Sequence, residues 1–263
     1  MLKKLLKYDL LFLYKGLIIF YALSIFFSIL TRIFMNIENS FIINIIGRIC
    51  LGVTISMVFN ILINNLMRMW ARFRSNLYGD ESYLTHTLPV TKTALYVSKT
   101  ISAVLSCFIS TVVIALSLFI ALYSKDFLTT LKNILLPVAD ILESSLFGII
   151  SAFLFILFLE FLNILQCGFT GIILGHRMNG SKIGFSVLFG FIVYIVSQQI
   201  ALLAVFITAL FNKELLNLFI TNSAINFGLI KTVILISSLT YLLLAVLGFI
   251  INLKLFKKGV NVD

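Results

Sequence analysis

Long apolar runs alternate with short polar connections along most of the chain. Six of these runs approach or exceed the roughly 20 residues that a helix needs to cross a bilayer. We predict membrane-spanning helices at residues 16–35, 47–66, 100–123, 145–166, 183–211 and 229–253. The fourth reaches residue 175 if it continues unbroken, and the fifth is long enough to predict tilt or a break. The pattern predicts an all-α integral membrane protein with about six transmembrane helices.

Composition supports this fold class, because 61% of the residues are hydrophobic and only 11% are charged. Soluble domains are about 45–50% apolar and about 25% charged. Apolar surface in this excess must face lipid. The chain has only 2 prolines, which favours uninterrupted helices over the alternating strands of a barrel. With no internal repeat and no linker, we predict a single transmembrane domain over residues 1–263.

The basic residues predict the orientation. Of the 20 lysines and arginines, 14 fall at the N-terminus, at the C-terminus and in the second and fourth connections. The side richer in Lys and Arg is normally cytoplasmic, so we expect both termini to be cytoplasmic. The net charge of +10 is spread along the flanks of the apolar runs. It forms no dense basic patch, which argues against binding of nucleic acid.

The first 15 residues differ from the spans that follow. Leucines recur there at helical spacing, at positions 2, 5, 6, 10 and 13, whereas lysines at 3, 4 and 7 lie on another face. This pattern is typical of an amphipathic helix in the headgroup layer, in contact with membrane lipid. The alternative is that residues 1–15 extend the first span.

Catalytic and metal-binding motifs are absent from the sequence. His86 and His176 belong to no zinc-protease motif, and there is no Gly-x-Ser-x-Gly. Residues 175–182 superficially resemble a phosphate loop but end in Ser-Lys and join two apolar helices. The cysteines at positions 50, 107 and 167 lie within apolar runs and are interpreted as buried thiols. We therefore expect no enzyme, no cofactor and no metal in this chain.

Polar residues within the apolar runs are the remaining candidates for a membrane-embedded site. They are Glu160, Gln198, Gln199, Asn60, Asn64 and Asn65. Such residues are costly in lipid and either line a translocation path or form hydrogen bonds between helices. Both interpretations stay open for Glu160, and the structural one is favoured for the others.

The longest polar stretch, residues 67–99, lies between the second and third predicted spans and is expected to be cytoplasmic. Residues 78–81 have turn chemistry. Pro89 is suited to the first turn of a helix that continues into the third span. Aromatic and apolar residues alternate here with acids and hydroxyls, a mixture that favours protein docking. The alternative is a simple connecting loop.

The string Tyr-Gly-Asp-Glu-Ser-Tyr-Leu-Thr-His-Thr-Leu-Pro-Val-Thr-Lys, residues 78–92, resembles the inner loop of bacterial ABC-2-type transporter permeases. The likeness covers residues 78–99 and is nearest to Gram-positive families with the signature D/E-G-Y-L-T-x-T-L-P-V-S/T. Ser82 replaces the usual glycine of that signature, and His86 stands where leucine is common.

The resemblance implies a permease subunit in the bacterial plasma membrane that forms a homo- or heterodimer. It pairs with a separate cytoplasmic ABC ATPase, which binds ATP and Mg²⁺, and it exports a peptide, lipid or drug. A coupling helix and the N-terminal helix contact the ATPase, and residues 212–228 are an outer, partly re-entrant segment. The coupling residues implied are Tyr78, Gly79, Asp80, Glu81, Tyr83, Leu84, Thr85, Leu88 and Pro89. Alternative functions are an ATP-independent channel or ion-coupled secondary transporter and, with less support, a membrane-embedded enzyme.

Overall fold

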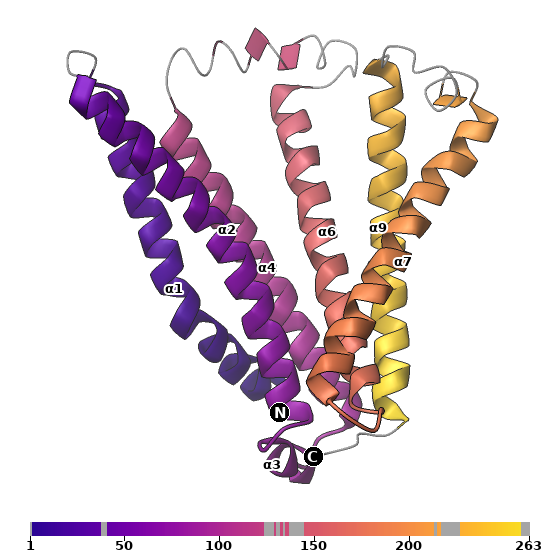
Figure 1. Cartoon of the computed structure of the whole chain (residues 1–263). Helices are drawn as coiled ribbons and strands as arrows, with labels where there is room; N and C mark the ends of the chain where they lie inside the picture. The colour runs from indigo at the N-terminus through magenta and orange to yellow at the C-terminus, as the bar shows by residue number, and fades with distance from the viewer. Residues whose placement is uncertain are drawn as a thin grey trace. The chain divides into compact units, whose positions relative to one another are not determined.

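The structure is a computed structural model that describes residues 2–37, 41–123, 129, 132–133, 135–136, 145–212, 215–216 and 227–258. Within these ranges the regular structure is entirely helical. The elements are α1 (Leu2–Met35), α2 (Phe41–Leu77), α3 (Ser82–Thr87), α4 (Lys92–Leu122), α6 (Leu146–Gly175), α7 (Lys182–Phe211) and α9 (Phe227–Lys257) (Figure 1).

The six long helices have the length and apolar composition of membrane spans, which confirms the predicted all-α, multi-pass class. The fourth predicted span does continue to Gly175, because α6 ends there. The fifth, α7, runs as one helix from Lys182 to Phe211, so the break allowed for in the prediction does not occur. Its 30 residues are about 45 Å long at 1.5 Å per residue, which leaves tilt or protrusion from the bilayer.

The chain divides into two compact units, Met1–Thr130 and Leu131–Asp263. Unit 1 contains α1, α2, α3 and α4, and unit 2 contains α6, α7 and α9. Each unit is described by itself. The outer segment predicted at residues 212–228 lies mostly outside the described residues.

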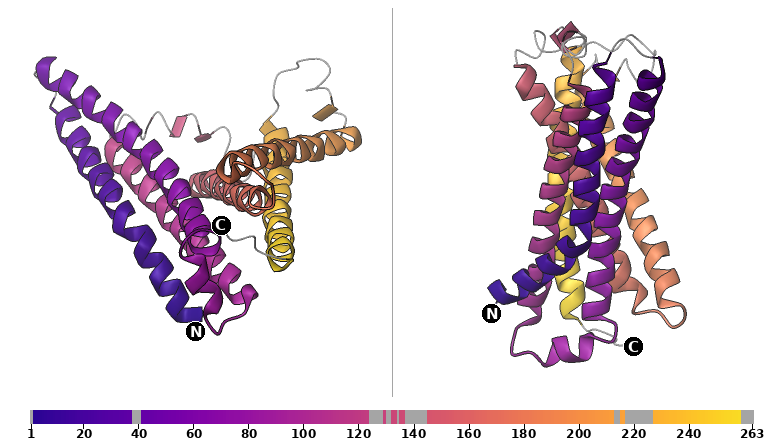
Figure 2. Two further views of the ribbon diagram at one scale, coloured as in Figure 1. Left: turned by 60° about the horizontal axis from the view of Figure 1, so that its bottom comes forward. Right: turned by 90° about the vertical axis from the view of Figure 1, so that its left-hand side faces the viewer.

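In unit 1 the helices α1, α2 and α4 pack side by side (Figures 1 and 2). Their contact face is polar as well as apolar. Tyr21 Oη and Ser110 Oγ share a hydrogen bond of 2.6 Å between α1 and α4. Further along the same pair, Ser24 Oγ donates to Ser117 Oγ at 2.9 Å. Hydroxyl pairs of this kind hold helices together where water is absent.

The first turns of α1 belong to the same helix as the first span, since α1 is unbroken from Leu2 to Met35. They bend away from the line of the remaining helix (Figures 1 and 2). Leu13 and Leu17 are buried on one face, whereas Lys3, Lys4 and Lys7 are exposed. The unbroken helix agrees with the interpretation of residues 1–15 as an extension of the first span. The bend and the exposed lysines agree with the interpretation of the same residues as an amphipathic segment. Its position in a headgroup layer stays a prediction.

In unit 2 the helix α6 packs against both α7 and α9. Glycines permit the closest approach. A Cβ atom on Gly171 would lie 2.4 Å from the Ser186 carbonyl oxygen and 2.6 Å from the Gly190 nitrogen. A Cβ atom on Gly175 would lie 2.4 Å from the Ser186 nitrogen. Backbone atoms of α7 block a side chain at both positions, together with Ser186 Oγ at Gly175, so this close crossing of α6 and α7 requires glycine there.

Candidate functional site

The α2–α4 connection begins with a tight turn after α2. Gly79 N–H donates to the Arg74 carbonyl at 3.0 Å, and Ser82 N–H donates to the Gly79 carbonyl at 2.8 Å. The turn predicted at residues 78–81 is therefore present. Gly79 is not in the positive-φ region. A side chain there would instead approach Ser75, since its Cβ atom would lie 3.2 Å from the Ser75 Cα and carbonyl oxygen.

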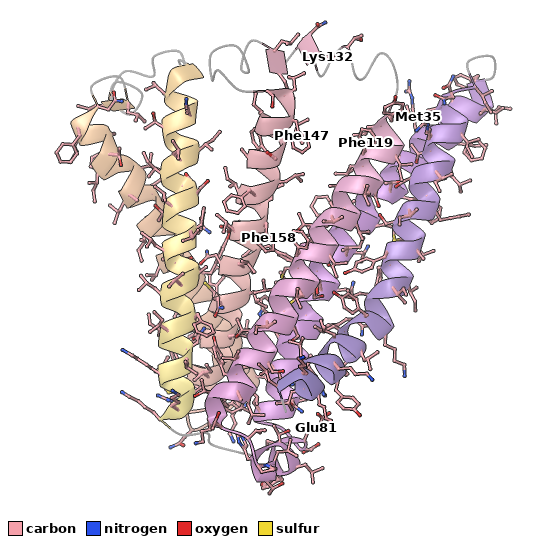
Figure 3. All side chains as sticks on the ribbon, turned by 180° about the vertical axis from the view of Figure 1, so that it is seen from behind. Met35, Glu81, Phe119, Lys132, Phe147 and Phe158 are labelled. Carbon is pink, nitrogen blue, oxygen red and sulfur yellow. The ribbon has the colours of Figure 1, made fainter. Side chains whose placement is uncertain are left out.

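The short helix α3 is fastened to the end of α2. His86 Nε2 donates to the carbonyl of Leu77, the last residue of α2, at 3.2 Å. Thr85 Oγ1 donates back to the Glu81 carbonyl at 2.9 Å. The first bond satisfies a carbonyl that the end of α2 leaves without an intrahelical partner, whereas the Glu81 carbonyl also accepts the Thr85 N–H at 3.0 Å. These bonds fix α3 at one end of unit 1, where Glu81 lies, opposite Met35 (Figure 3).

The start of α4 differs from the prediction. Pro89 is not in its first turn, since α4 begins at Lys92. Thr91 is the N-cap, and its Oγ1 accepts the Ala94 N–H at 3.2 Å. A threonine at this position satisfies an amide that has no intrahelical partner. Pro89 precedes the cap and belongs to the bend between α3 and α4.

The predicted coupling residues divide by exposure. Leu84 is 76% exposed and Tyr83 is 62% exposed, both on α3. Other exposed members are Asp80, Glu81, Leu88 and Pro89. Tyr78 is only 1% exposed, Thr85 is buried, and Gly79 is intermediate. The exposed residues give this end of unit 1 an apolar and acidic surface. The buried residues, Tyr78 and Thr85, lie beneath that surface.

Aromatic packing explains the burial of Tyr78. Its ring lies 6.3 Å from that of Phe73 in α2, and the Phe73 ring meets Tyr96 of α4 edge to face at 6.1 Å. All three rings are nearly inaccessible. Because edge-to-face pairs add to the burial of apolar area, this cluster sets the position of the turn relative to α2 and α4.

An ion network lies directly behind this surface and joins it to α1. The Asp9 carboxylate, 3% exposed, accepts from Lys99 Nζ of α4 and from Arg72 Nε of α2 at 3.3 Å. Ser98 Oγ donates to its other oxygen at 3.1 Å. A buried charge is tolerated only when it is paired and hydrogen-bonded. Asp9 meets both conditions, so it joins α1, α2 and α4 at one point.

The same network continues to the turn. Arg72 Nη1 donates to Glu81 Oε2 at 2.7 Å, and Asn76 Nδ2 donates to the same oxygen at 2.9 Å. Arg72 therefore bridges a buried acid in α1 and an exposed acid at the start of α3. The guanidinium fork suits such two-sided pairing. Arg72 therefore links the turn to Asp9 through a single side chain.

Sequence reasoning missed Asp9. Its signal was available, because Asp9 is the only acid before residue 38 and lies at helical spacing with Leu13 and Leu17. A buried acid on the apolar face of an amphipathic helix needs a cation, and Arg72 and Lys99 both belong to the polar stretch predicted between the second and third spans.

The second candidate site lies in unit 2 and includes two of the predicted intramembrane polar residues. Glu160 Oε1 accepts from Gln198 Nε2 at 2.8 Å and from Tyr194 Oη at 3.1 Å. Tyr241 Oη donates to Gln198 Oε1 at 2.9 Å. Gln199 is exposed and is not part of this group. Three helices thus contribute to one polar cluster, which we call the Glu160 cluster.

A second polar contact lies farther along α6. Asn252 of α9 donates through Nδ2 to Gln166 Oε1 at 2.9 Å, and Thr170 Oγ1 donates to Asn252 Oδ1 at 2.8 Å. These side chains are buried and satisfy one another. This group is a helix–helix contact with no unused polar capacity to suggest a ligand site.

The other predicted polar residues have structural roles. Asn65 is buried and joins α2 to α4 by donating to Ser110 Oγ at 2.6 Å and accepting from Ser106 Oγ at 2.8 Å. Asn60 and Asn64 bond only the preceding turn of their own helix. The described residues contain no group of three or more His, Cys, Asp or Glu that would hold a metal ion.

Comparison with known proteins found no family model, no curated protein and no solved structure that matches this chain.

Proposed function

We infer that this chain is the transmembrane permease subunit of an ATP-driven ABC-2-type exporter. The single observation that carries the proposal is the exposed apolar surface of α3, which projects from the end of a membrane-spanning helix bundle. Leu84 and Tyr83 expose most of their area there. Large apolar side chains outside the lipid are costly unless a partner covers them.

The acidic residues beside α3 and its side-chain links to three spans favour an ATPase as that partner. Asp80 and Glu81 flank the apolar side chains, a mixture suited to a reversible protein interface. Behind them, the Arg72–Asp9–Lys99 network connects the turn to three spans. In the proposed mechanism, ATP-driven closure of the paired ATPases displaces α3, and the displacement reaches α1, α2 and α4 through this network. Hydrolysis of ATP takes place on the partner subunit.

The remaining parts of the proposal rest on sequence. The resemblance at residues 78–99 supplies the export direction, the pairing of two permease subunits and the bacterial plasma membrane. The Lys and Arg bias supplies cytoplasmic termini. An even number of crossings requires both termini on one side, which agrees with that orientation.

The test is reconstitution of the full chain with the ABC-type ATPase encoded beside it, followed by measurement of association and of ATP-dependent transport. We expect a stable complex whose transport stops when ATP is replaced by a non-hydrolysable analogue. Failure of the two proteins to associate would overturn the proposal.

One observation favours a second candidate, an ion-coupled carrier. The Glu160 cluster places a carboxylate within a spanning helix, and such residues are frequent in ion and proton pathways. This alternative predicts transport without any ATPase in vesicles that carry an ion gradient. Transport that requires ATP and persists when the gradient is dissipated would exclude it.

A further inference from the structure

Glu160 lies close to the middle of α6. It is 14 residues after Leu146, the first residue of that helix, which is about 21 Å along the helix axis. It is also the only acidic residue in the sequences of α6, α7 and α9. A charged group at such depth is unfavourable by about 2.5–3.5 kcal/mol on insertion scales unless it is compensated.

Compensation within the chain is incomplete. Oε1 accepts two hydrogen bonds, from Tyr194 and Gln198. Oε2 is buried and accepts no hydrogen bond from the described residues. A carboxylate has about four lone-pair sites, so half of its accepting capacity is unused. Hydrogen bonding between helices explains the position of Oε1, but it does not explain why Oε2 is buried.

No described cation of unit 2 forms an ion pair with the carboxylate. The ion pairs found among the described side chains all belong to the network of Asp9, Arg72, Lys99 and Glu81 in unit 1. Unit 1 shows that this protein pairs its buried acid with two basic groups. The contrast indicates that Glu160 can take a counter-charge from a bound molecule.

The surroundings of the carboxylate suit an organic cation. Tyr241 fixes the Gln198 amide so that its nitrogen, and not its oxygen, faces Glu160. The hydroxyls of Tyr194 and Tyr241 bring two aromatic side chains to the site, and aromatic rings attract alkylammonium groups. Exposed apolar side chains, including Leu157 on α6 and Ile195 on α7, lie within one turn of the cluster along their helices. They provide a surface for an apolar tail.

We propose that the Glu160 cluster binds the ammonium group of an amphipathic cargo molecule. Oε2 accepts hydrogen bonds from the ammonium, while Tyr194 and Gln198 hold Oε1 in place. The inference rests on the proposed exporter function and narrows its substrate class to cationic amphipaths. It concerns binding alone, so it is testable without an ATPase.

The experiment uses the purified full-length chain in lipid nanodiscs, without nucleotide and without partner. The probes are a dansyl-labelled long-chain primary amine and its N-acetylated analogue, which has the same tail and no charge. A charge-assisted hydrogen bond predicts binding of the amine about tenfold tighter than that of the analogue. Equal affinity of the two probes for the unmodified protein would overturn the proposal.

Substitutions at and beside Glu160 test whether its carboxylate causes the preference for the amine. Glu160→Gln keeps an oxygen to accept from Tyr194 and Gln198 but has no charge, and it should bind both probes equally. Glu160→Asp keeps the charge and should retain part of the preference. Gln199→Ala, next to the cluster but outside it, is the matched control and should resemble the unmodified protein. If Glu160→Gln retains the preference, the site is elsewhere and the proposal is wrong.

The two proposals fail in different ways. Selective amine binding without association with an ATPase would contradict the exporter and leave the cation site intact. Association with an ATPase together with equal binding of the two probes would contradict the cation site and leave the exporter intact.

Discussion

Both units contain acidic and other polar side chains among apolar helices, but the partners of these side chains differ between the units. Unit 1 buries Asp9 and surrounds it with Lys99, Arg72 and Ser98, so that its charges are balanced internally. In the described part of unit 2, Glu160 has neutral hydrogen-bond partners only, and the α6–α7 contact depends on glycines that admit no side chain. The difference is that the buried acid of unit 1 is neutralised by basic side chains, whereas Glu160 has only neutral hydrogen-bond partners among the described residues of unit 2.

The largest expected effect on stability comes from the ion network around Asp9 in unit 1. Asp9→Asn leaves Lys99 buried without its anion, whereas Arg72 keeps its pair with Glu81, and removal of one partner from a buried pair costs about 3–5 kcal/mol. We expect a corresponding fall in the free energy of unfolding, measured by SDS titration in mixed micelles. Glu81→Gln is the control, because the Glu81 side chain is 49% exposed and such pairs contribute about 0–1 kcal/mol.

A compensating variant sharpens this prediction. Asp9→Asn combined with Lys99→Met removes the buried cation that Asp9→Asn leaves uncompensated and should recover part of the lost stability. Additive losses in the double variant would show that Asp9 and Lys99 do not interact.

The next effect concerns the glycine contact of unit 2. Gly171→Ala places a Cβ atom 2.4 Å from a backbone oxygen of α7, and overpacking costs about 1–3 kcal/mol. Gly52→Ala is the same change within α2, where no atom lies within 4 Å of the added carbon. We expect a lower thermal unfolding temperature for Gly171→Ala only. Equal temperatures for the two variants would contradict the close α6–α7 crossing.

A smaller effect on stability is expected at the polar seam between α2 and α4, which consists of Asn65, Ser106 and Ser110. Asn65→Leu removes hydrogen bonds to Ser106 and Ser110, and interhelical bonds of this kind contribute about 0.6–2 kcal/mol. Asn60→Leu is the matched control, because Asn60 bonds only its own helix. The two variants are compared by SDS titration, and a loss at Asn60 as large as at Asn65 would contradict the assignment of the seam.

The smallest expected effect on stability is that of Glu160→Gln. The substitution retains an acceptor for Tyr194 and Gln198 and removes a charge without a cationic partner among the described residues. We expect the free energy of unfolding to be unchanged or slightly increased. A loss comparable to that of Asp9→Asn would show that the carboxylate is structurally neutralised, which would remove the contrast between the units.

Much of the fold follows from the sequence, because crossing a bilayer imposes length and composition directly. All six predicted spans coincide with helices, although the helices extend beyond the apolar runs, as α2 does to Leu77. The start of α4 was predicted too early, because Pro89 was placed in its first turn, whereas Thr91 is the N-cap and the helix begins at Lys92. Both residues are common near helix starts, and only the backbone distinguishes them.

The sites were less predictable for a physical reason. Glu160 and Gln198 stood out because polar residues are rare in apolar runs. Their partner Tyr241 did not, because hydropathy does not say which faces of separate helices meet. Gly171 and Gly175 do carry a sequence signal, since small residues four apart favour close helix contact. That Tyr78 and Thr85 are buried beneath the surface they were expected to form also depends on tertiary packing.

The most direct test of the central claim is the affinity of an ABC ATPase for the α3 surface. Leu84→Asp places a charge on the most exposed apolar side chain of α3, and Met178→Asp makes a similar change in the short α6–α7 connection, where Met178 is also exposed. We predict that Leu84→Asp weakens binding of the ATPase to the chain in nanodiscs by about tenfold or more, whereas Met178→Asp binds like the unmodified protein. Unchanged binding by Leu84→Asp, or equal losses in both variants, would contradict the account.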